Sequence, residues 1–175
     1  PFEAALHVPL IIRDPRAPQG HGTTVDHFTE SIDIAPTLVD WVGRTPDISF
    51  NGQSLLPFLA GAAPETWRSS IFCEVDFGDP LTPTRFQEEM DLSQFQSNFA
   101  VLRDEHFKYV HFNGGLPPLL FDLKADPHEL TDLAASPSHR DHLLHYANLM
   151  LDHRMSFAHH AMSRMLITST GIQSR

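Results

Sequence analysis

The sequence predicts an α/β protein in two parts, in which the end of an α/β sheet domain precedes a small α+β subdomain with an antiparallel sheet and a packed long helix. Three features of the 175-residue chain predict this fold. Residues 8–12 form a continuous apolar run, which is typical of a strand covered on both faces. Residues 70–123 contain strand-like runs separated by turn residues. The longest helical pattern follows them and continues to about Arg154.

The N-terminal part is predicted to contain two strands and one amphipathic helix. The strands are expected over residues 8–12 and, half-exposed, over residues 23–28. The helix is expected to begin at Asp33 as its N-cap and to end at Gly43. Its apolar face at helical spacing consists of Ile34, Leu38, Trp41 and Val42.

The C-terminal part is predicted to be an antiparallel sheet with a helix laid on it. After a single helical turn within residues 54–61, strands are expected over residues 70–77, 98–104, 106–113 and 119–123. Residues 78–96, with two prolines and several charged residues, are expected to form a long loop. Asp126 and Pro127 are expected to begin a short helix. The long helix follows Ser136 and Pro137, and its expected buried stripe consists of Leu143, Leu144, Ala147, Met150 and Leu151.

These elements divide the chain into three segments. Residues 1–65 are interpreted as the end of an α/β domain, residues 66–156 as the sheet-and-helix subdomain, and residues 157–175 as an extended tail. The tail carries Met162, Met165, Leu166 and Ile167 and is expected to be a docking arm or loose. Because the chain starts at Pro1 and runs almost at once into an apolar strand, we expect further chain to precede it.

Composition and charge exclude several classes of partner. Twelve basic and twenty-two acidic residues give a formal charge of −10, which argues against binding nucleic acid or an anionic membrane. No apolar run approaches the roughly 20 residues that a membrane-spanning helix needs. The single cysteine, Cys73, provides no internal disulfide and is compatible with a reducing cytoplasm.

Four phrases, in this order, give the chain a family resemblance. They are Val-Pro-Leu-Ile-Ile at 8–12, Ile-Asp-Ile-Ala-Pro-Thr-Leu at 32–38, Gly-Gln-Ser-Leu-Leu-Pro at 52–57 and Leu-Phe-Asp-Leu-Lys-Ala-Asp-Pro-His-Glu at 120–129. Together they resemble the C-terminal third of sulfatases of the alkaline phosphatase superfamily. The Arg13-Asp14-Pro15 ending, the excursion around Phe86 and Phe95 and the His- and Arg-bearing helix are similar to phosphonate monoester hydrolases and related phosphodiesterases.

The resemblance implies a hydrolase of sulfate, phosphonate or phosphate esters. Members of this superfamily use a formylglycine nucleophile made in a C/S-x-P-x-R motif and a divalent metal such as Mn, Ca or Zn held by Asp, Asn and His. Neither motif is found here, since Cys73 is followed by Glu-Val-Asp-Phe and the proline after Ser136 comes one place too early. The resemblance places the Asp-His metal pair and the catalytic lysine before Pro1. We therefore predict no catalytic, cofactor-binding or metal-binding residue in this chain, and no activity of the chain alone.

Several residues nevertheless suggest sites. His139, His142 and His145 recur every three residues and His159 and His160 follow, but no Cys or carboxylate completes a metal set, so a solvated face is favoured. The other candidates each have a structural and a functional interpretation. These are His7 as a cleft or structural histidine, Asp76 and Asp79 beside Gly78 as a cation loop or turn formers, Asp122 and Asp126 as turn and cap residues, and Phe77, Phe86 and Phe95 as a substrate entrance or subunit contact.

Two hypotheses from different classes follow. In the first, the chain supplies scaffold and one cleft wall to a metal-dependent hydrolase of a small-molecule ester, which by family analogy forms a homo-oligomer. In the second, the chain is a stand-alone binding or oligomerisation module derived from such an enzyme. The first is favoured because residues 8–12 are patterned for burial by structure that this chain does not contain.

Overall fold

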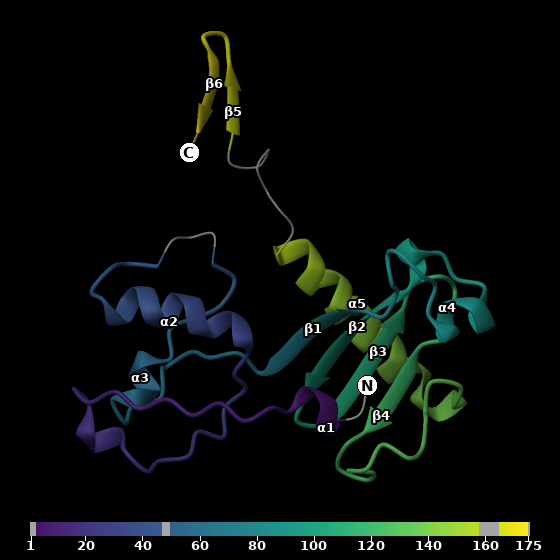
Figure 1. Cartoon of the computed structure of the whole chain (residues 1–175), viewed down its shortest axis with the longest axis horizontal. Helices are drawn as coiled ribbons and strands as arrows, with labels where there is room; N and C mark the ends of the chain where they lie inside the picture. The colour runs from purple at the N-terminus through teal and green to yellow at the C-terminus, as the bar shows by residue number, and fades with distance from the viewer. Residues whose placement is uncertain (1–2, 47–49, 158–164, 175) are drawn as a thin grey trace.

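A four-stranded antiparallel sheet with a long helix packed on one face forms the centre of the computed structural model, which describes residues 3–46, 50–157 and 165–174 (Figure 1). The strand order is β1-β2-β3-β4, the order of the sequence. The bounds are Ser70–Asp76 for β1, Asn98–Asp104 for β2, Phe107–Phe112 for β3, Leu119–Asp122 for β4 and Arg140–Phe157 for the helix α5. The predicted antiparallel sheet with a long helix is confirmed.

The hydrophobic core lies between this sheet and α5. Alternate side chains of a strand point to the same face, and the strand register places Leu102 opposite Tyr109 and Tyr109 opposite Leu120. Tyr146 and Met150 of α5 are buried against this row. The sheet and α5 therefore stabilise each other by apolar burial.

The buried face of α5 differs from the predicted stripe. Met150 is buried as expected, but Leu144 and Leu151 are 61% and 56% exposed. The buried face is centred on Tyr146, whose hydroxyl donates to Asp104 Oδ2 at 2.6 Å. Because neighbouring residues are about 100° apart around a helix, a face centred on Tyr146 and Met150 excludes these two leucines.

Short helices form the N-terminal part. They are α1 (Glu3–Leu6), the 3₁₀ turns η1 (Pro18–Gly20) and η2 (Ser31–Asp33), α2 (Ile34–Trp41) and α3 (Leu56–Leu59). The predicted helix is confirmed over α2, and Gly43 ends it with a positive φ of 76°. The turn predicted within residues 54–61 is confirmed as α3.

The two strands predicted in this part are wrong for the described chain. Residues 8–12 and 23–28 are irregular, and Ile11 is 92% exposed. A strand of a parallel sheet takes its hydrogen bonds from neighbouring strands. No described strand pairs with either segment, so the apolar pattern of residues 8–12 does not produce a strand here.

The excursion between β1 and β2 is structured, contrary to the prediction of a loop. It contains α4 (Arg85–Met90) and the 3₁₀ turn η3 (Gln94–Gln96). Thr84 caps α4 by accepting the Gln87 N–H, and the buried Gln87 side chain accepts from the N–H groups of Thr84 and Asp79. This capping box gives an otherwise proline-rich segment a fixed shape.

The short helix predicted after Asp126 is also wrong. The segment is a turn in which Asp126 Oδ2 accepts the Thr131 N–H at 2.7 Å. Glu129 has a φ of 56°, in the left-handed region, which a right-handed helix does not contain. The 3₁₀ turn η4 (Pro137–His139) then leads into α5, as the Ser136-Pro137 start predicted.

The tail contains a hairpin of β5 (Met165–Thr168) and β6 (Gly171–Ser174), drawn beyond α5 in Figure 1. Met162, His159 and His160 lie outside the described residues. The segment boundaries predicted at residues 65 and 156 stay a prediction.

Among the described residues, no helix has the length and hydrophobicity that crossing a bilayer requires.

Candidate functional site

Apolar side chains are exposed in two short segments of the N-terminal part. Ile11 is 92% exposed in the irregular segment, and Leu38 is 59% exposed on α2. Single exposed apolar residues are ordinary, but a concentration of them indicates a contact surface. We call this set the N-terminal apolar residues: Val8, Leu10, Ile11, Ile12, Ile34, Leu38, Trp41 and Val42.

Arg16 ties the end of the first segment to α2. Its Nη1 donates to the Trp41 carbonyl at 2.9 Å, and its guanidinium lies 4.4 Å from the centre of the Trp41 ring. The side-chain and backbone hydrogen bonds of Arg16 lower the pKa of the Asp14 carboxyl to about 2. The two apolar segments are therefore held relative to each other.

A buried ion cluster fixes α2 against the sheet. Asp33 is fully buried and accepts both terminal nitrogens of Arg68, with 2.6 Å between Nη2 and Oδ1. Glu30 Oε2 lies 3.5 Å from Arg68 Nε, and Glu30 Oε1 accepts the Phe72 N–H of β1 at 2.7 Å. Arg68 thus joins two acidic residues before α2 to the start of the sheet.

Asp33 occupies the predicted N-cap position of α2, but its side chain does not cap the helix. The Asp33 side chain makes no capping bond to α2, and instead accepts the N–H groups of Glu30 and Gln53, each at 2.8 Å. Burial opposes ionisation of Asp33, but these bonds and those from Arg68 outweigh it and lower its pKa. Asp33 therefore remains a carboxylate in the interior.

We expect the folded protein to lose stability in acid through Asp33. Its pKa is lower folded than unfolded, so its contribution is complete above the ordinary value near 4 and is lost as pH falls through the folded value. Urea unfolding at pH 6 and pH 3 measures this loss. Asp33→Asn should shrink the difference between the two pH values, while Asp26→Asn in an exposed loop should leave it unchanged. Equal losses in both variants would contradict this role.

A second buried ion cluster lies on the opposite face of the sheet from α5. Lys108 of β3 is fully buried, and its Nζ lies 2.7 and 2.8 Å from the two carboxylate oxygens of Glu129. Glu3 of α1 lies beside this pair, with Oε1 3.2 Å from Arg103 Nη2. Charged side chains therefore join α1 to the sheet.

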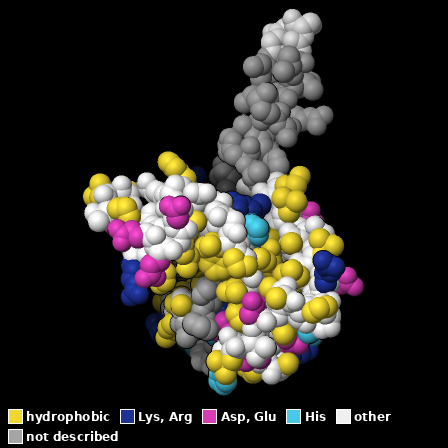
Figure 2. Space-filling model, turned by 90° about the vertical axis from the view of Figure 1, so that its right-hand side faces the viewer, with side chains coloured by type: hydrophobic (Ala, Val, Ile, Leu, Met, Phe, Trp, Pro, Cys, Tyr) yellow, Lys and Arg dark blue, Asp and Glu magenta, His cyan; other side chains and the backbone are white. Residues whose placement is uncertain are grey.

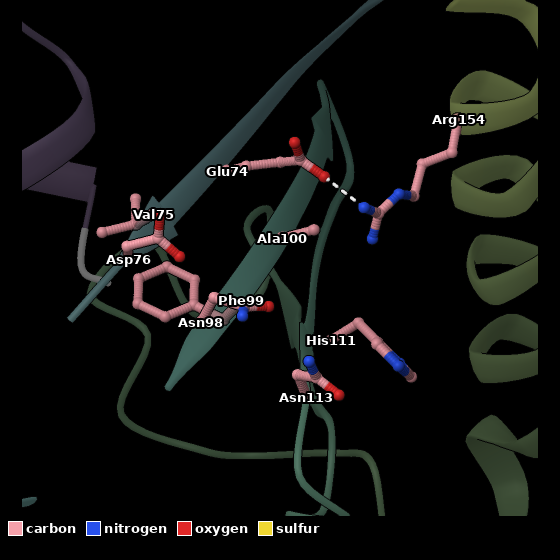
Figure 3. A pocket seen from close by; sticks show the side chains of 9 residues that line it. All are labelled: Glu74, Val75, Asp76, Asn98, Phe99, Ala100, His111, Asn113 and Arg154. Carbon is pink, nitrogen blue, oxygen red and sulfur yellow. Dashed lines mark ion pairs between the residues drawn. The ribbon is translucent and has the colours of Figure 1, made fainter. Parts of the chain in front are cut away.

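A polar groove of about 450 Å³ lies between the sheet and the C-terminal half of α5 (Figure 3). Arg154 reaches from α5 to Glu74 of β1, with 2.8 Å between Nη2 and Oε1, and both side chains are about half exposed. His111 faces the groove, and its Nδ1 lies 3.1 Å from the Tyr109 hydroxyl. The remaining lining consists of Val75, Asp76, Asn98, Phe99, Ala100 and Asn113.

The histidines of α5 pack against aromatic rings. His142 stacks on Phe107 with 4.8 Å between ring centres, and His145 meets Tyr146 edge-on at 5.3 Å. His139 lies 5.9 Å from the His142 ring. In residues 3–46, 50–157 and 165–174, no three His, Cys, Asp or Glu side chains are grouped so as to hold a metal.

The predicted acidic candidates form turns or line the groove. Asp79 Oδ1 accepts the N–H groups of Leu81 and Thr82, and these bonds lower its pKa. Asp122 Oδ1 accepts two successive backbone N–H groups after β4, as turn chemistry predicted. Asp76 lies in the groove, and His7 is exposed just after α1, where its N–H donates to the Glu3 carbonyl.

The aromatic candidates separate into two groups. Phe77 packs inward against Phe99, with 6.2 Å between ring centres. Phe86 and Phe95 are exposed on the excursion, as are Leu81 and Met90. Figure 2, which views the molecule from the side of α4, shows hydrophobic side chains gathered on this face. Only the exposed group is available for contact with a ligand or partner.

The described residues do not fit the formylglycine and divalent metal that the family resemblance implies. Cys73 lies within β1, and burial raises the pKa of its thiol, which disfavours the thiolate. The carboxylates with the deepest burial, Asp33 and Glu129, are already paired with Arg68 and Lys108. No reaction step can be assigned to the side chains of this part of the chain.

The sequence interpretation missed the residues that hold the apolar segments, above all Arg68 and Lys108. Lys108 carried a signal, since strand alternation places it on the same face as Val110, an apolar residue. A lysine at an apolar position of a strand indicates a buried ion pair, because an unpaired charge is too costly there. Arg68 carried no comparable signal in its loop.

Comparison with known proteins identifies the class. Residues 1–155 match the family of N-sulphoglucosamine sulphohydrolase C-terminal regions. The chain is 38% identical over 171 residues to the multifunctional alkaline phosphatase superfamily protein PehA of Trinickia caryophylli, covering 98% of this chain and 33% of that protein. It is 31% identical to human arylsulfatase K, covering 76% of this chain and 23% of the relative.

The solved structures give the same result. The phosphonate monoester hydrolase of Agrobacterium radiobacter matches with a TM-score of 0.81 and 43% identity, over 93% of this chain and 32% of that one. The enzyme of Silicibacter pomeroyi matches at 0.74 and 40%, over 84% of this chain and 29% of that one. The fold is thus that of the C-terminal part of a sulfatase-type hydrolase. The chain belongs to the sulfatase family of the alkaline phosphatase superfamily, and it spans between about a quarter and a third of the length of its curated relatives.

Proposed function

We propose that this chain is the C-terminal part of a metal-dependent hydrolase of phosphonate, sulfate or phosphate esters. It supplies scaffold and one wall of the cleft, and it is inactive alone. The observation that carries the proposal is the exposure of the N-terminal apolar residues, which are patterned for burial. About two thirds of the relative PehA lies outside the region that matches this chain, and we infer that the corresponding part of this protein covers these residues.

Phosphonate monoesters are the favoured substrate class within this proposal. The two phosphonate monoester hydrolases are 43% and 40% identical to this chain, against 31% for human arylsulfatase K. The formylglycine, the divalent metal and its ligands would lie in the part of the protein outside this chain. The lone Cys73 supports a reducing compartment such as the cytoplasm.

A second candidate function is a binding or oligomerisation module. The exposed side chains of Leu81, Phe86, Met90 and Phe95 favour it. The capped α4 carries Phe86 and Met90, and the turn η3 carries Phe95. In a full-length hydrolase the same residues would form a substrate entrance or a contact within a homo-oligomer. The two candidates differ in whether the gene product catalyses hydrolysis.

Hydrolysis assays test the proposal. We expect the full-length gene product, supplied with Mn²⁺, to hydrolyse a phosphonate monoester faster than an aryl sulfate or a phosphodiester, and the 175-residue chain to hydrolyse none of them. The control is the full-length product treated with a chelator. Turnover by the 175-residue chain, or an upstream reading frame without C/S-x-P-x-R and an Asp-His pair, would overturn the proposal.

A further inference from the structure

The ion cluster around Lys108 is more elaborate than stability requires. The Lys108 side chain is fully buried, and the Glu129 side chain is 2% exposed. Removing two charges from water costs several kcal/mol each, and an apolar pair of similar size is often equally stable or better. A buried ion pair is better explained when the positions of its charged groups serve a purpose besides stability.

The backbone at Glu129 supports this view. Its φ of 56° lies in the left-handed region, which is strained for a residue other than glycine. Such a conformation persists only where the surroundings fix it. At Glu129 this backbone conformation directs the carboxylate toward the face of the sheet opposite α5. There Lys108 Nζ lies 2.7 and 2.8 Å from its two oxygens.

Lys108 and Glu129 each make a further contact, and both contacts are with Glu3. Glu129 Oε1 accepts the Glu3 N–H at 3.1 Å, and Lys108 Nζ lies 3.8 Å from Glu3 Oε2. Arg103 Nη2 lies 3.2 Å from Glu3 Oε1, while its guanidinium stacks 4.9 Å from the centre of the Phe28 ring. The cluster therefore binds both the main chain and the side chain of a glutamate in the first turn of a helix.

Glu3 is directly coupled to the segment that carries the proposed function. The His7 N–H donates to the Glu3 carbonyl at 2.8 Å, and the Val8 N–H donates to the Leu6 carbonyl at 3.0 Å. No residue separates this turn from the apolar run at 8–12. The orientation of α1 therefore sets the direction in which residues 8–12 leave the sheet subdomain.

We propose that Glu3 is a positioning residue, and that Lys108, Glu129 and Arg103 form the site that binds it. The site fixes α1, and through α1 it directs residues 8–12 into the sheet of the full-length hydrolase. The effect on turnover rests on the proposed function. The effect on the local structure of residues 3–8 does not.

Glu3→Gln separates positioning from stability. It removes the charge that faces Arg103 and leaves the Lys108–Glu129 pair complete, so the sheet should melt at nearly the same temperature. In the 175-residue chain we expect the amides of His7 and Val8 to exchange about tenfold faster with deuterium, with β2 and β3 unchanged. The matched control is Glu65→Gln in an exposed loop, which should change neither.

In the full-length protein, Glu3→Gln should lower kcat about tenfold and leave KM within about twofold. The reason is that a scaffold in the wrong orientation misaligns distant catalytic groups with the substrate. Unchanged exchange at His7 and Val8 would overturn the proposal even if the wild type is active. If the full-length wild type hydrolyses none of the esters, the proposed function fails, and the exchange rates alone decide whether Glu3 positions α1. Faster exchange with unchanged kcat would overturn the effect on turnover.

Discussion

Arg68→Ala is expected to lower the free energy of unfolding by about 3–5 kcal/mol, a large part of the stability of a domain. The variant leaves the fully buried Asp33 carboxylate with two backbone N–H donors and no counter-charge. It also removes the cation beside Glu30, whose pKa burial already raises. Urea unfolding monitored by the fluorescence of the protein measures the loss.

Two further variants make this result specific. Arg68→Lys keeps the charge but cannot donate two parallel hydrogen bonds to Asp33, so it should recover only part of the stability. Arg85→Ala removes an exposed arginine paired with Glu89 and should cost about 0.5 kcal/mol or less. An Arg68→Ala variant as stable as Arg85→Ala would show that the cluster does not hold α2.

Lys108→Met is expected to cost about 3–5 kcal/mol as well, because it leaves Glu129 buried and charged without a cation. Methionine retains an unbranched apolar stem of similar shape without the ammonium group, so the loss mainly reports the charge. The same urea titration measures it. Lys124→Met, in an exposed turn, is the matched control and should be close to neutral.

A double variant distinguishes a lost ion pair from lost packing. Adding Glu129→Gln to Lys108→Met removes the unpaired charge and should recover more than half of the lost stability. If the two substitutions add without recovery, the loss comes from packing. The interpretation of Lys108 and Glu129 as a coupled pair would then be wrong.

The sheet was predictable from sequence because its strands pair within the chain. Residues 98–104 and 107–112 are neighbours in sequence and in the sheet, so their pairing requires only a short turn. The same reasoning predicted a strand wrongly at residues 8–12. Their apolar pattern favours burial on both faces, but no described strand pairs with them, and their side chains are exposed.

The absence of a side-chain cap at Asp33 and the absence of a helix after Asp126 have a common cause. A carboxylate before a helical pattern has good local N–H partners, so sequence favours a cap. At Asp33 the side chain instead accepts hydrogen bonds from the guanidinium of Arg68, which lies 35 residues away in the sequence. Near Asp126 the left-handed backbone of Glu129, whose carboxylate contacts Lys108, is incompatible with the predicted helix. Local propensity does not include such long-range ion pairs.

The candidate site was less predictable than the fold. Phe86 and Phe95 of the 78–96 excursion were recognised as candidates, but the exposed Leu81 and Met90 were not. The helix that carries Phe86 depends on the side chain of Gln87. The groove between β1 and α5 combines Glu74 and Arg154, which are 80 positions apart, so no spacing rule connects them. Residues brought together by tertiary structure need the structure to be found.

Amide hydrogen exchange at Val8, Leu10, Ile11 and Ile12 tests the central claim most directly. In the 175-residue chain these amides have no partner in a described strand, apart from the Val8 bond to Leu6, and should exchange within seconds to minutes. In the full-length gene product they should be protected at least a hundredfold, because the segment becomes a strand of the main sheet. Equal exchange in both proteins would show that residues 8–12 are not part of that sheet, and would contradict the account of this chain as the scaffold end of a larger hydrolase.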